Sequence, residues 1–140
     1  MNGPIVVGTD GSETAAIALD AAINFARSFG QPLHIVSAYK PLGVSGLPAE
    51  FEGSITSTTE VDAVMADALA RARTAGVEAH GHSESGSAAE ALLEVAERVS
   101  ADVIVVGNRG IRSKARYVLG NVPSKVVHNA MCSTFVVQTS

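Results

Sequence analysis

The sequence alternates short apolar runs with segments of helical periodicity along its whole length, and this alternation restricts the fold more than any other feature. Four runs rich in β-branched residues, 4–10, 32–39, 101–107 and 133–139, are typical of strands buried in a sheet. A weaker alternating run at 77–83 predicts a strand at a sheet edge. Helical segments separate these runs, and the resulting β-α-β-α-β-α-β-α-β order predicts an open parallel sheet with helices on both faces.

Capping residues and apolar stripes mark the expected helices. Ser12 is an N-cap for a helix that runs to Phe29, and Gly30 provides its C-terminal stop. Ser and Glu three residues apart form capping-box patterns before the next two helices, and a short last helix follows Gly120. The two capping boxes are Ser57 with Glu60 and Ser87 with Glu90, and the residues expected to face inward are Leu19, Ile23, Ala26, Val61, Val64, Ala68, Ala72, Ala89, Leu92, Ala96, Val99, Val122, Val126 and Val127.

With 140 residues, of which 46% are hydrophobic and 17% charged, the chain has the composition of one compact domain, residues 1–140. No apolar run approaches the ~20 residues that cross a bilayer. Residues 1–12 also lack the basic and long apolar regions of a secretory signal. The single cysteine, Cys132, excludes an internal disulfide and suits a reducing compartment. We therefore expect a cytoplasmic protein that has no membrane partner.

Positive charge is concentrated in the last part of the chain. All 14 acidic residues lie within residues 1–102, together with five basic ones, whereas residues 103–140 contain five basic residues and no acid. A local positive field on a chain of net charge −4 favours a small anionic ligand over nucleic acid, which usually meets a broad basic face. A solvated surface loop explains the charge pattern equally well at this stage.

Two of the expected strands end in glycine-containing turns. The first strand ends in "GTDGS", residues 8–12, and the fourth ends in "GNRG", residues 107–110. In an open parallel sheet, ligands bind outside the carboxyl ends of the strands, where the strand order reverses. Glycines allow close backbone approach, and helix starts near Ser12 and Asn121 present amides that favour anions. These turns therefore predict an anion-binding site.

The glycine spacing in the second turn is similar to a family signature. Gly107, Gly110 and Gly120 resemble the universal stress protein signature, glycine-two-glycine-nine-glycine followed by Ser or Thr. The opening "VGTDGS", residues 7–12, resembles the family's first strand and turn, and "MCSTFVV", residues 131–137, resembles its closing strand. The resemblance extends in order over essentially all 140 residues.

The resemblance implies an α/β fold with an open five-stranded parallel sheet in the order 3-2-1-4-5, Rossmann-like and of the adenine nucleotide alpha hydrolase-like type. It also implies ATP or another adenine nucleotide between strands one and four. By position, Asp10 meets the ribose or base, the backbone near Ala38 reads the adenine edge, and the last helix donates amides to phosphates. The implied nucleotide-binding residues are Gly8, Thr9, Asp10, Ala38, Val106, Gly107, Arg109, Gly110, Gly120, Asn121 and Val122. Countercharge is available from Arg109, Arg112, Lys114 and Arg116.

Asn121 departs from the family pattern, which has a hydroxyl residue there, and Pro123 has no N–H to donate. An asparagine side chain that caps the helix cannot also hold a phosphate. We therefore predict a weaker grip on the distal phosphates of ATP, which Mg²⁺ could accompany. AMP or a cyclic nucleotide is the alternative ligand.

Other chemistry-bearing residues have simpler interpretations. "DGS" is turn chemistry, so Asp10 has an alternative role as a turn former. His80 and His82 share one face of the expected 77–83 strand, but no third ligand is evident, which favours a surface role over a metal site. Cys132 and His128 lie four residues apart, and a packed thiol is favoured over a nucleophile–base pair.

The function expected from these residues is a non-catalytic, adenine-nucleotide-binding stress-response module. Residues 40–57 would form a mobile lid, and an apolar edge strand at 134–139 would pair in a homodimer. One alternative is a slow ATP hydrolase or phosphotransferase, with Asp10 and His128 as bases, although no acid follows Asp102 to hold Mg²⁺. The second alternative is a structural partner protein that binds no nucleotide.

Overall fold

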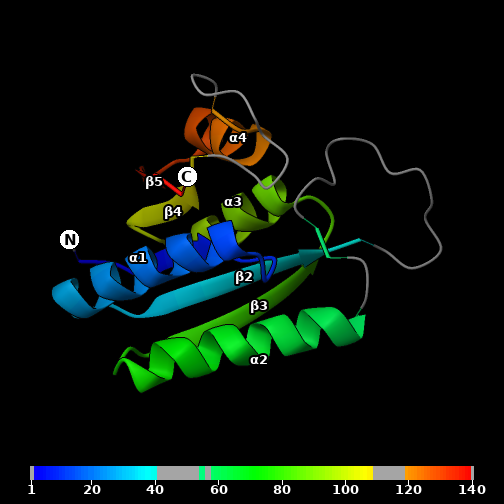
Figure 1. Ribbon diagram of the computed structural model, residues 1–140. Coiled ribbons are helices and arrows are strands. Elements are labelled where there is room, and N and C mark those ends of the chain that lie inside the picture. The colour runs from blue at the N-terminus through cyan, green and yellow to red at the C-terminus, as the bar shows by residue number, and fades with distance from the viewer. Residues whose placement is uncertain (1, 41–53, 56–57, 109–118, 140) are drawn as a thin grey trace.

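The computed structural model describes residues 2–40, 54–55, 58–108 and 119–139. Strands and helices alternate along the chain as the sequence predicts (Figure 1). In chain order they are β1 (Ile5–Gly8), α1 (Glu13–Phe29), β2 (Leu33–Tyr39), α2 (Thr58–Thr74), β3 (Ala79–Ser85), α3 (Ala88–Arg98), β4 (Val103–Gly107), α4 (Asn121–Asn129) and β5 (Ser133–Val137). None of the helices in the described ranges is long and apolar enough to cross a membrane.

The strands form one parallel sheet in the order β3-β2-β1-β4-β5, which confirms the predicted topology. The β1 strand lies at the centre, with Ile5 opposite Leu33 of β2 and opposite Val103 of β4. Since β2 and β3 add to one side of β1 while β4 and β5 add to the other, the strand order reverses between β1 and β4. The carboxyl ends of these two strands are therefore the place where a parallel sheet of this kind holds a ligand.

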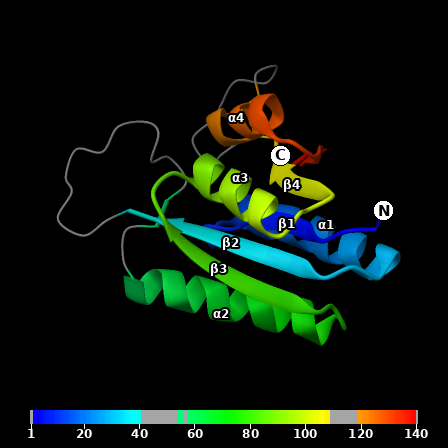
Figure 2. The same ribbon diagram turned by 180° about the vertical axis from the view of Figure 1, so that it is seen from behind.

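Helices cover both faces of the sheet (Figures 1 and 2). Successive strand residues point to opposite faces, so Ile5 and Val7 pack in one core with α1 and α2, whereas Val6 packs in a second core with α3 and α4. Both cores are almost entirely aliphatic, which follows from the scarcity of aromatic residues in the sequence. The central strand is thereby buried on both sides, and it forms a rigid base for the turn that follows it.

The predicted ends of α1 and α3 are confirmed by their capping geometry. The Ser12 hydroxyl accepts a hydrogen bond from a first-turn amide of α1, and Gly30 ends that helix with a left-handed φ of 62°. The Ser87 hydroxyl accepts from the backbone N–H of Glu90 at the start of α3. Ser57, the proposed cap of α2, lies outside the described residues.

One of the residues expected to face inward is placed differently in the structure. Val127 is 45% exposed, because the nine-residue α4 packs only a narrow stripe that contains the fully buried Val126. Val64, Val99 and Val122 are half-buried, and Val99 and Val122 pack against the core beneath α3 and α4. The other predicted positions are buried.

Candidate functional site

The turn between β1 and α1 is held by its own side chains. Gly11 has a φ of 83°, a left-handed conformation that favours glycine. Its backbone N–H donates to Thr9 Oγ1 at 3.2 Å, and the Ser12 N–H donates to Asp10 Oδ1 at 2.9 Å. Asp10 therefore stabilises the turn through Oδ1. Its other carboxylate oxygen, Oδ2, is compatible with a ligand hydroxyl.

The two glycines that bracket this turn lie close to side chains of the packed helices, and the contact is tighter at Gly11 than at Gly8. A Cβ added at Gly8 would lie 3.3 Å from Leu92 Cδ2 of α3. A Cβ added at Gly11 would lie 2.8 Å from Val64 Cγ2 of α2, closer than real Cβ contacts come. Helices from both faces of the sheet therefore approach the backbone of this turn and fix its position at the carboxyl end of β1.

Asn108 organises the end of β4. Its backbone N–H donates to the Val137 carbonyl of β5 at 2.8 Å, and its own carbonyl accepts from the Gly120 N–H at 3.0 Å. Its side-chain Oδ1 accepts from the Thr139 N–H at 2.9 Å and from the Thr139 hydroxyl at 3.1 Å. One residue of "GNRG" thus joins the end of β4, the chain after β5 and the start of α4. Sequence analysis noted only the glycines around it.

The last helix, α4, follows Gly120 as the sequence predicts. Gly120 is the N-cap, with φ −60° and ψ 165° and no side-chain capping hydrogen bond, and Asn121 is the first residue of the helix. The expectation that the Asn121 side chain caps α4 is therefore wrong. Pro123 brings no N–H to the first turn, so the residues of that turn before Ser124 that carry a backbone N–H are Asn121 and Val122.

The predicted site residues are partly brought together by the sheet. Gly8 ends β1 and Thr9 and Asp10 follow it, while Gly107 ends the neighbouring β4, whose Val105 lies opposite Val7. The hydrogen bond from Gly120 to Asn108 holds the start of α4 against this same end of β4. Arg109 and Gly110 lie outside the described residues, as do the other cations of the turn, Arg112, Lys114 and Arg116.

Ala38 and Val106 have less room for a ligand than the resemblance implies. The Ala38 carbonyl accepts a hydrogen bond from the Ile55 N–H at 2.7 Å, and Ile55 lies beside the end of β2, bridged to Tyr39. An adenine that used this carbonyl would share it with Ile55. The Val106 side chain is buried in the core shared with α3 and α4, so only its backbone belongs to the floor of the site.

A groove of about 270 Å³ lies between α1 and α2. Thr9 and Ser12 of the β1–α1 turn line it, and Asp67 and Arg71 of α2 supply charged groups. Arg71 Nε lies 3.3 Å from an oxygen of Asp20 in an exposed ion pair. The groove is on the face of the sheet that α1 and α2 cover, opposite α3 and α4.

Cys132 and His128 do not form a catalytic pair. The His128 ring is hydrogen-bonded through Nδ1 to the Ser124 carbonyl at 2.8 Å. Cys132 packs half-buried against the core beneath α3 and α4, and burial, with a smaller contribution from Asp102, raises the pKa of its thiol. A raised thiol pKa disfavours the thiolate that a nucleophile requires, which agrees with the interpretation of a packed cysteine.

Comparison with known proteins decides the family. A model of the universal stress protein family matches residues 1–138. The chain belongs to this family. The assignment confirms the resemblance drawn from the glycine spacing and from "VGTDGS", and it agrees with the 3-2-1-4-5 sheet.

Relatives and solved structures match nearly the full length of the chain. A universal stress protein of Mycobacterium tuberculosis is 33% identical over 97% of this chain and 96% of its own. One from Methanocaldococcus jannaschii is 32% identical over 96% of this chain and 81% of its own. A crystal structure of a universal stress protein in complex with cAMP superposes with a TM-score of 0.77 at 31% identity, covering 99% of this chain and 98% of that one.

Proposed function

We propose that this universal stress protein binds an adenine nucleotide at the carboxyl ends of β1 and β4, with cAMP and AMP as the first ligands to test. The observation that carries the proposal is the similarity, 31% identity with a TM-score of 0.77, to a family member in complex with cAMP. The signature glycines Gly107, Gly110 and Gly120 support it, because they stand at the spacing of the nucleotide-binding branch.

The geometry supports a ligand with one phosphate better than one with three. The first turn of α4 starts at a glycine without a side-chain cap, and Pro123 removes one of its amides. Two backbone amides suit one phosphate group, whereas distal phosphates need further donors or Mg²⁺. In the β1–α1 turn, the N–H groups of Gly11 and Ser12 are already bonded to Thr9 and Asp10.

In this proposal the protein acts in the cytosol, where nucleotide binding regulates it. The nucleotide is not turned over. A hydrolase would need a base near the phosphates, and the two candidates from the sequence are poorly placed. Asp10 directs one oxygen into its own turn. His128 lies near the far end of α4, about 10 Å along the axis from Asn121 at the usual rise per residue.

Three measurements separate this proposal from its alternatives. Mass spectrometry of the purified protein identifies a retained nucleotide, calorimetry compares cAMP, AMP and ATP, and labelled ATP reports turnover. We expect binding without turnover. Turnover would favour the slow hydrolase. If no adenine nucleotide binds, the remaining hypothesis is a structural partner protein.

A paired substitution tests the location of the site. Replacing Gly107 and Gly120 together by Val should abolish nucleotide binding, because side chains would fill the space of the phosphate. Val127→Ala alters an exposed position of the same α4 and should leave the affinity unchanged. Unaltered binding in the glycine variant would place the nucleotide elsewhere.

We also propose that the protein forms a homodimer through β5. This strand is at the sheet edge, as predicted, and it exposes Phe135 and Val136, with the 96% exposed Met131 just before it. An uncovered apolar edge strand readily pairs with another strand. Light scattering at micromolar concentration should give twice the mass of 14.3 kDa, and Val136→Lys should give a monomer. A monomeric wild type would reject this pairing.

A further inference from the structure

Three of the four histidines meet on one face of the sheet, at β2 and β3. His34 of β2 lies directly opposite His80 of β3 in the ladder, and His82 is two residues further along the same strand. Because alternate strand residues share a face, all three side chains project from the same side. Sequence analysis paired His80 with His82 alone, and the structure adds His34 beside them, although no three-ligand metal set is formed among the described residues. The third histidine is contributed by another strand.

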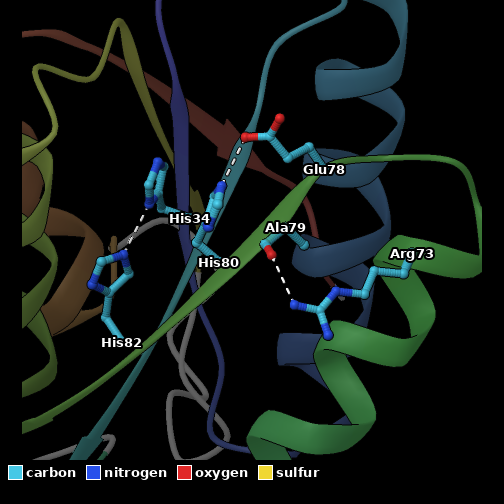
Figure 3. A network of polar contacts seen from close by, with 6 residues as sticks. All are labelled: His34, Arg73, Glu78, Ala79, His80 and His82. Carbon is cyan, nitrogen blue, oxygen red and sulfur yellow. Dashed lines mark hydrogen bonds and ion pairs between the residues drawn. The ribbon is translucent and has the colours of Figure 1, made fainter.

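The three rings are in close contact (Figure 3). His34 Nδ1 and His82 Nε2 are 2.8 Å apart and share a hydrogen bond. The His80 ring stacks on His34 with centroids 5.0 Å apart, and its Nε2 is 2.7 Å from Glu78 Oε2. Figure 3 shows the rings on the side of β3 away from Arg73 and α2, where the sheet edge is not covered by that helix.

Two imidazoles of this cluster, those of His34 and His82, have lowered pKa values. Burial lowers the pKa of His34, and the neighbouring His82 and His80 act in the same direction. Burial also lowers the pKa of His82, assisted by Arg98, while Glu84 partly opposes the shift. Neutral imidazole is the form that binds a metal ion, and both shifts favour it.

We propose that His34 and His82 form a two-nitrogen chelate for a divalent transition-metal ion, Cu²⁺ or Ni²⁺. Among the described residues, no three His, Cys, Asp or Glu side chains already converge on a metal position. The proposed site is accordingly a cross-strand pair, and water completes the coordination. On binding, the ring that donates the shared hydrogen bond moves its proton to its other nitrogen, so the metal replaces the hydrogen bond without net loss of a proton.

The spacing of the two nitrogens matches a tetragonal ion. Imidazole–metal bonds of about 2.0 Å that meet at a right angle place their nitrogens about 2.8 Å apart. The observed separation of His34 Nδ1 and His82 Nε2 is 2.8 Å, so turning the rings toward a common point requires little change in distance. Tetrahedral Zn²⁺ would need a wider pair. His80 is the neighbouring imidazole, held by Glu78 as ligating histidines commonly are held by a carboxylate.

A metal ion bound at His34 and His82 would affect the β3 edge of the sheet and not the proposed nucleotide site. His34 and His80 are the second residues of β2 and β3 and His82 is at the middle of β3, whereas the proposed nucleotide site is at the carboxyl ends of β1 and β4. A metal ion that joins His34 to His82 would link the edge strand β3 to its neighbour. Binding to the native state alone would then raise the stability of the protein.

Calorimetric titration of the full-length protein with Ni²⁺ tests the proposal, with the melting temperature as a second readout. We expect one Ni²⁺ per chain and a raised melting temperature. His34→Gln and His82→Gln should each weaken binding by more than about tenfold, and His80→Gln by less. His128→Gln, the matched control on α4, should bind as the wild type does, and Mg²⁺, which prefers oxygen ligands, should show no binding.

Far-UV circular dichroism without metal shows whether each variant is folded, and Arg98→Gln provides an independent test that keeps all four histidines. Arg98 lies near His82 and pairs with Glu84 at 3.0 Å. Removal of its positive charge should strengthen Ni²⁺ binding. Absence of Ni²⁺ binding to the wild type, or equal affinity in the wild type and a folded His82→Gln, would overturn the proposal.

Discussion

Asn108 Oδ1 accepts two hydrogen bonds from Thr139, one from its backbone N–H and one from its hydroxyl. This contact ties the chain after β5 to the turn that follows β4. Thr139 is one of the few buried polar residues among those described. Since the Asn108 carbonyl also accepts the Gly120 N–H, the same residue positions the start of α4, where we propose that a phosphate binds.

Asn108→Ala should lower the stability of the protein, whereas the backbone carbonyl that accepts the Gly120 N–H is kept. The substitution leaves the buried Thr139 hydroxyl and N–H without their acceptor, a loss of about 1–3 kcal/mol in the free energy of unfolding. Urea denaturation measures this loss. Asn129→Ala, which removes an exposed side-chain bond to the Lys125 carbonyl, is the matched control and should change stability by less than about 0.5 kcal/mol. Equal effects of the two substitutions would show that Asn108 has no special role.

Gly11→Ala should destabilise the protein for two separable reasons. The φ of 83° costs an L-residue about 1–2 kcal/mol, and the new Cβ would meet Val64 Cγ2 at 2.8 Å. Gly30→Ala has the first cost without the second, because nothing lies within 4 Å of a Cβ there. The melting temperature of Gly11→Ala should therefore be lower than that of Gly30→Ala. Adding Val64→Ala to Gly11→Ala should recover part of the difference. If the two alanine variants have the same melting temperature, the contact with Val64 of α2 does not add to the cost of Gly11→Ala.

The reactivity of Cys132 should be low in the folded protein. Burial raises the pKa of its thiol, so at pH 8 a smaller fraction is thiolate than in the unfolded chain, and alkylation by iodoacetamide should be slower than in urea. A group whose pKa is higher in the folded state stabilises the fold below its unfolded pKa, and that contribution is lost as pH rises through the folded value. Stability above pH ~8.5 should therefore fall more steeply in the wild type than in Cys132→Ser. Equal alkylation rates with and without urea would contradict the burial argument.

Much of the fold follows from local patterns in the sequence. Runs of β-branched residues separated by helical periods specify a parallel α/β sheet, and Ser12, Gly30 and Ser87 cap the helices through contacts within a few residues. The glycine spacing also led to the family. These features depend on neighbours along the chain, which a sequence displays directly.

The features that sequence analysis missed depend on register and on tertiary contact. His34 meets His82 only because β2 and β3 pair with His34 opposite His80. His34 and His82 are 48 positions apart in the sequence, so a linear pattern does not show that they are neighbours. Ile55 reaches the Ala38 carbonyl from a segment without periodicity. The helix α4 follows Gly120 as predicted, but its N-cap is Gly120 itself and not the Asn121 side chain, because backbone geometry and not residue preference decides which residue caps a helix.

Asn121→Ser should strengthen ATP binding more than cAMP binding. Because Gly120 is the N-cap, residue 121 stands within the first turn of α4, and a serine there restores the hydroxyl that the family signature carries. A hydroxyl donor beside the helix start can bond a phosphate oxygen, and a triphosphate has more oxygens in reach than the single phosphate of cAMP. We expect the ratio of ATP to cAMP affinity to rise by about tenfold, which corresponds to roughly one hydrogen bond to a charged group. Calorimetry of both variants with both ligands measures the ratio, and Ser124→Ala, one turn further along α4, serves as the control. An unchanged ratio would mean that the distal phosphates do not lie near residue 121, and that the preference for one phosphate arises elsewhere in the site.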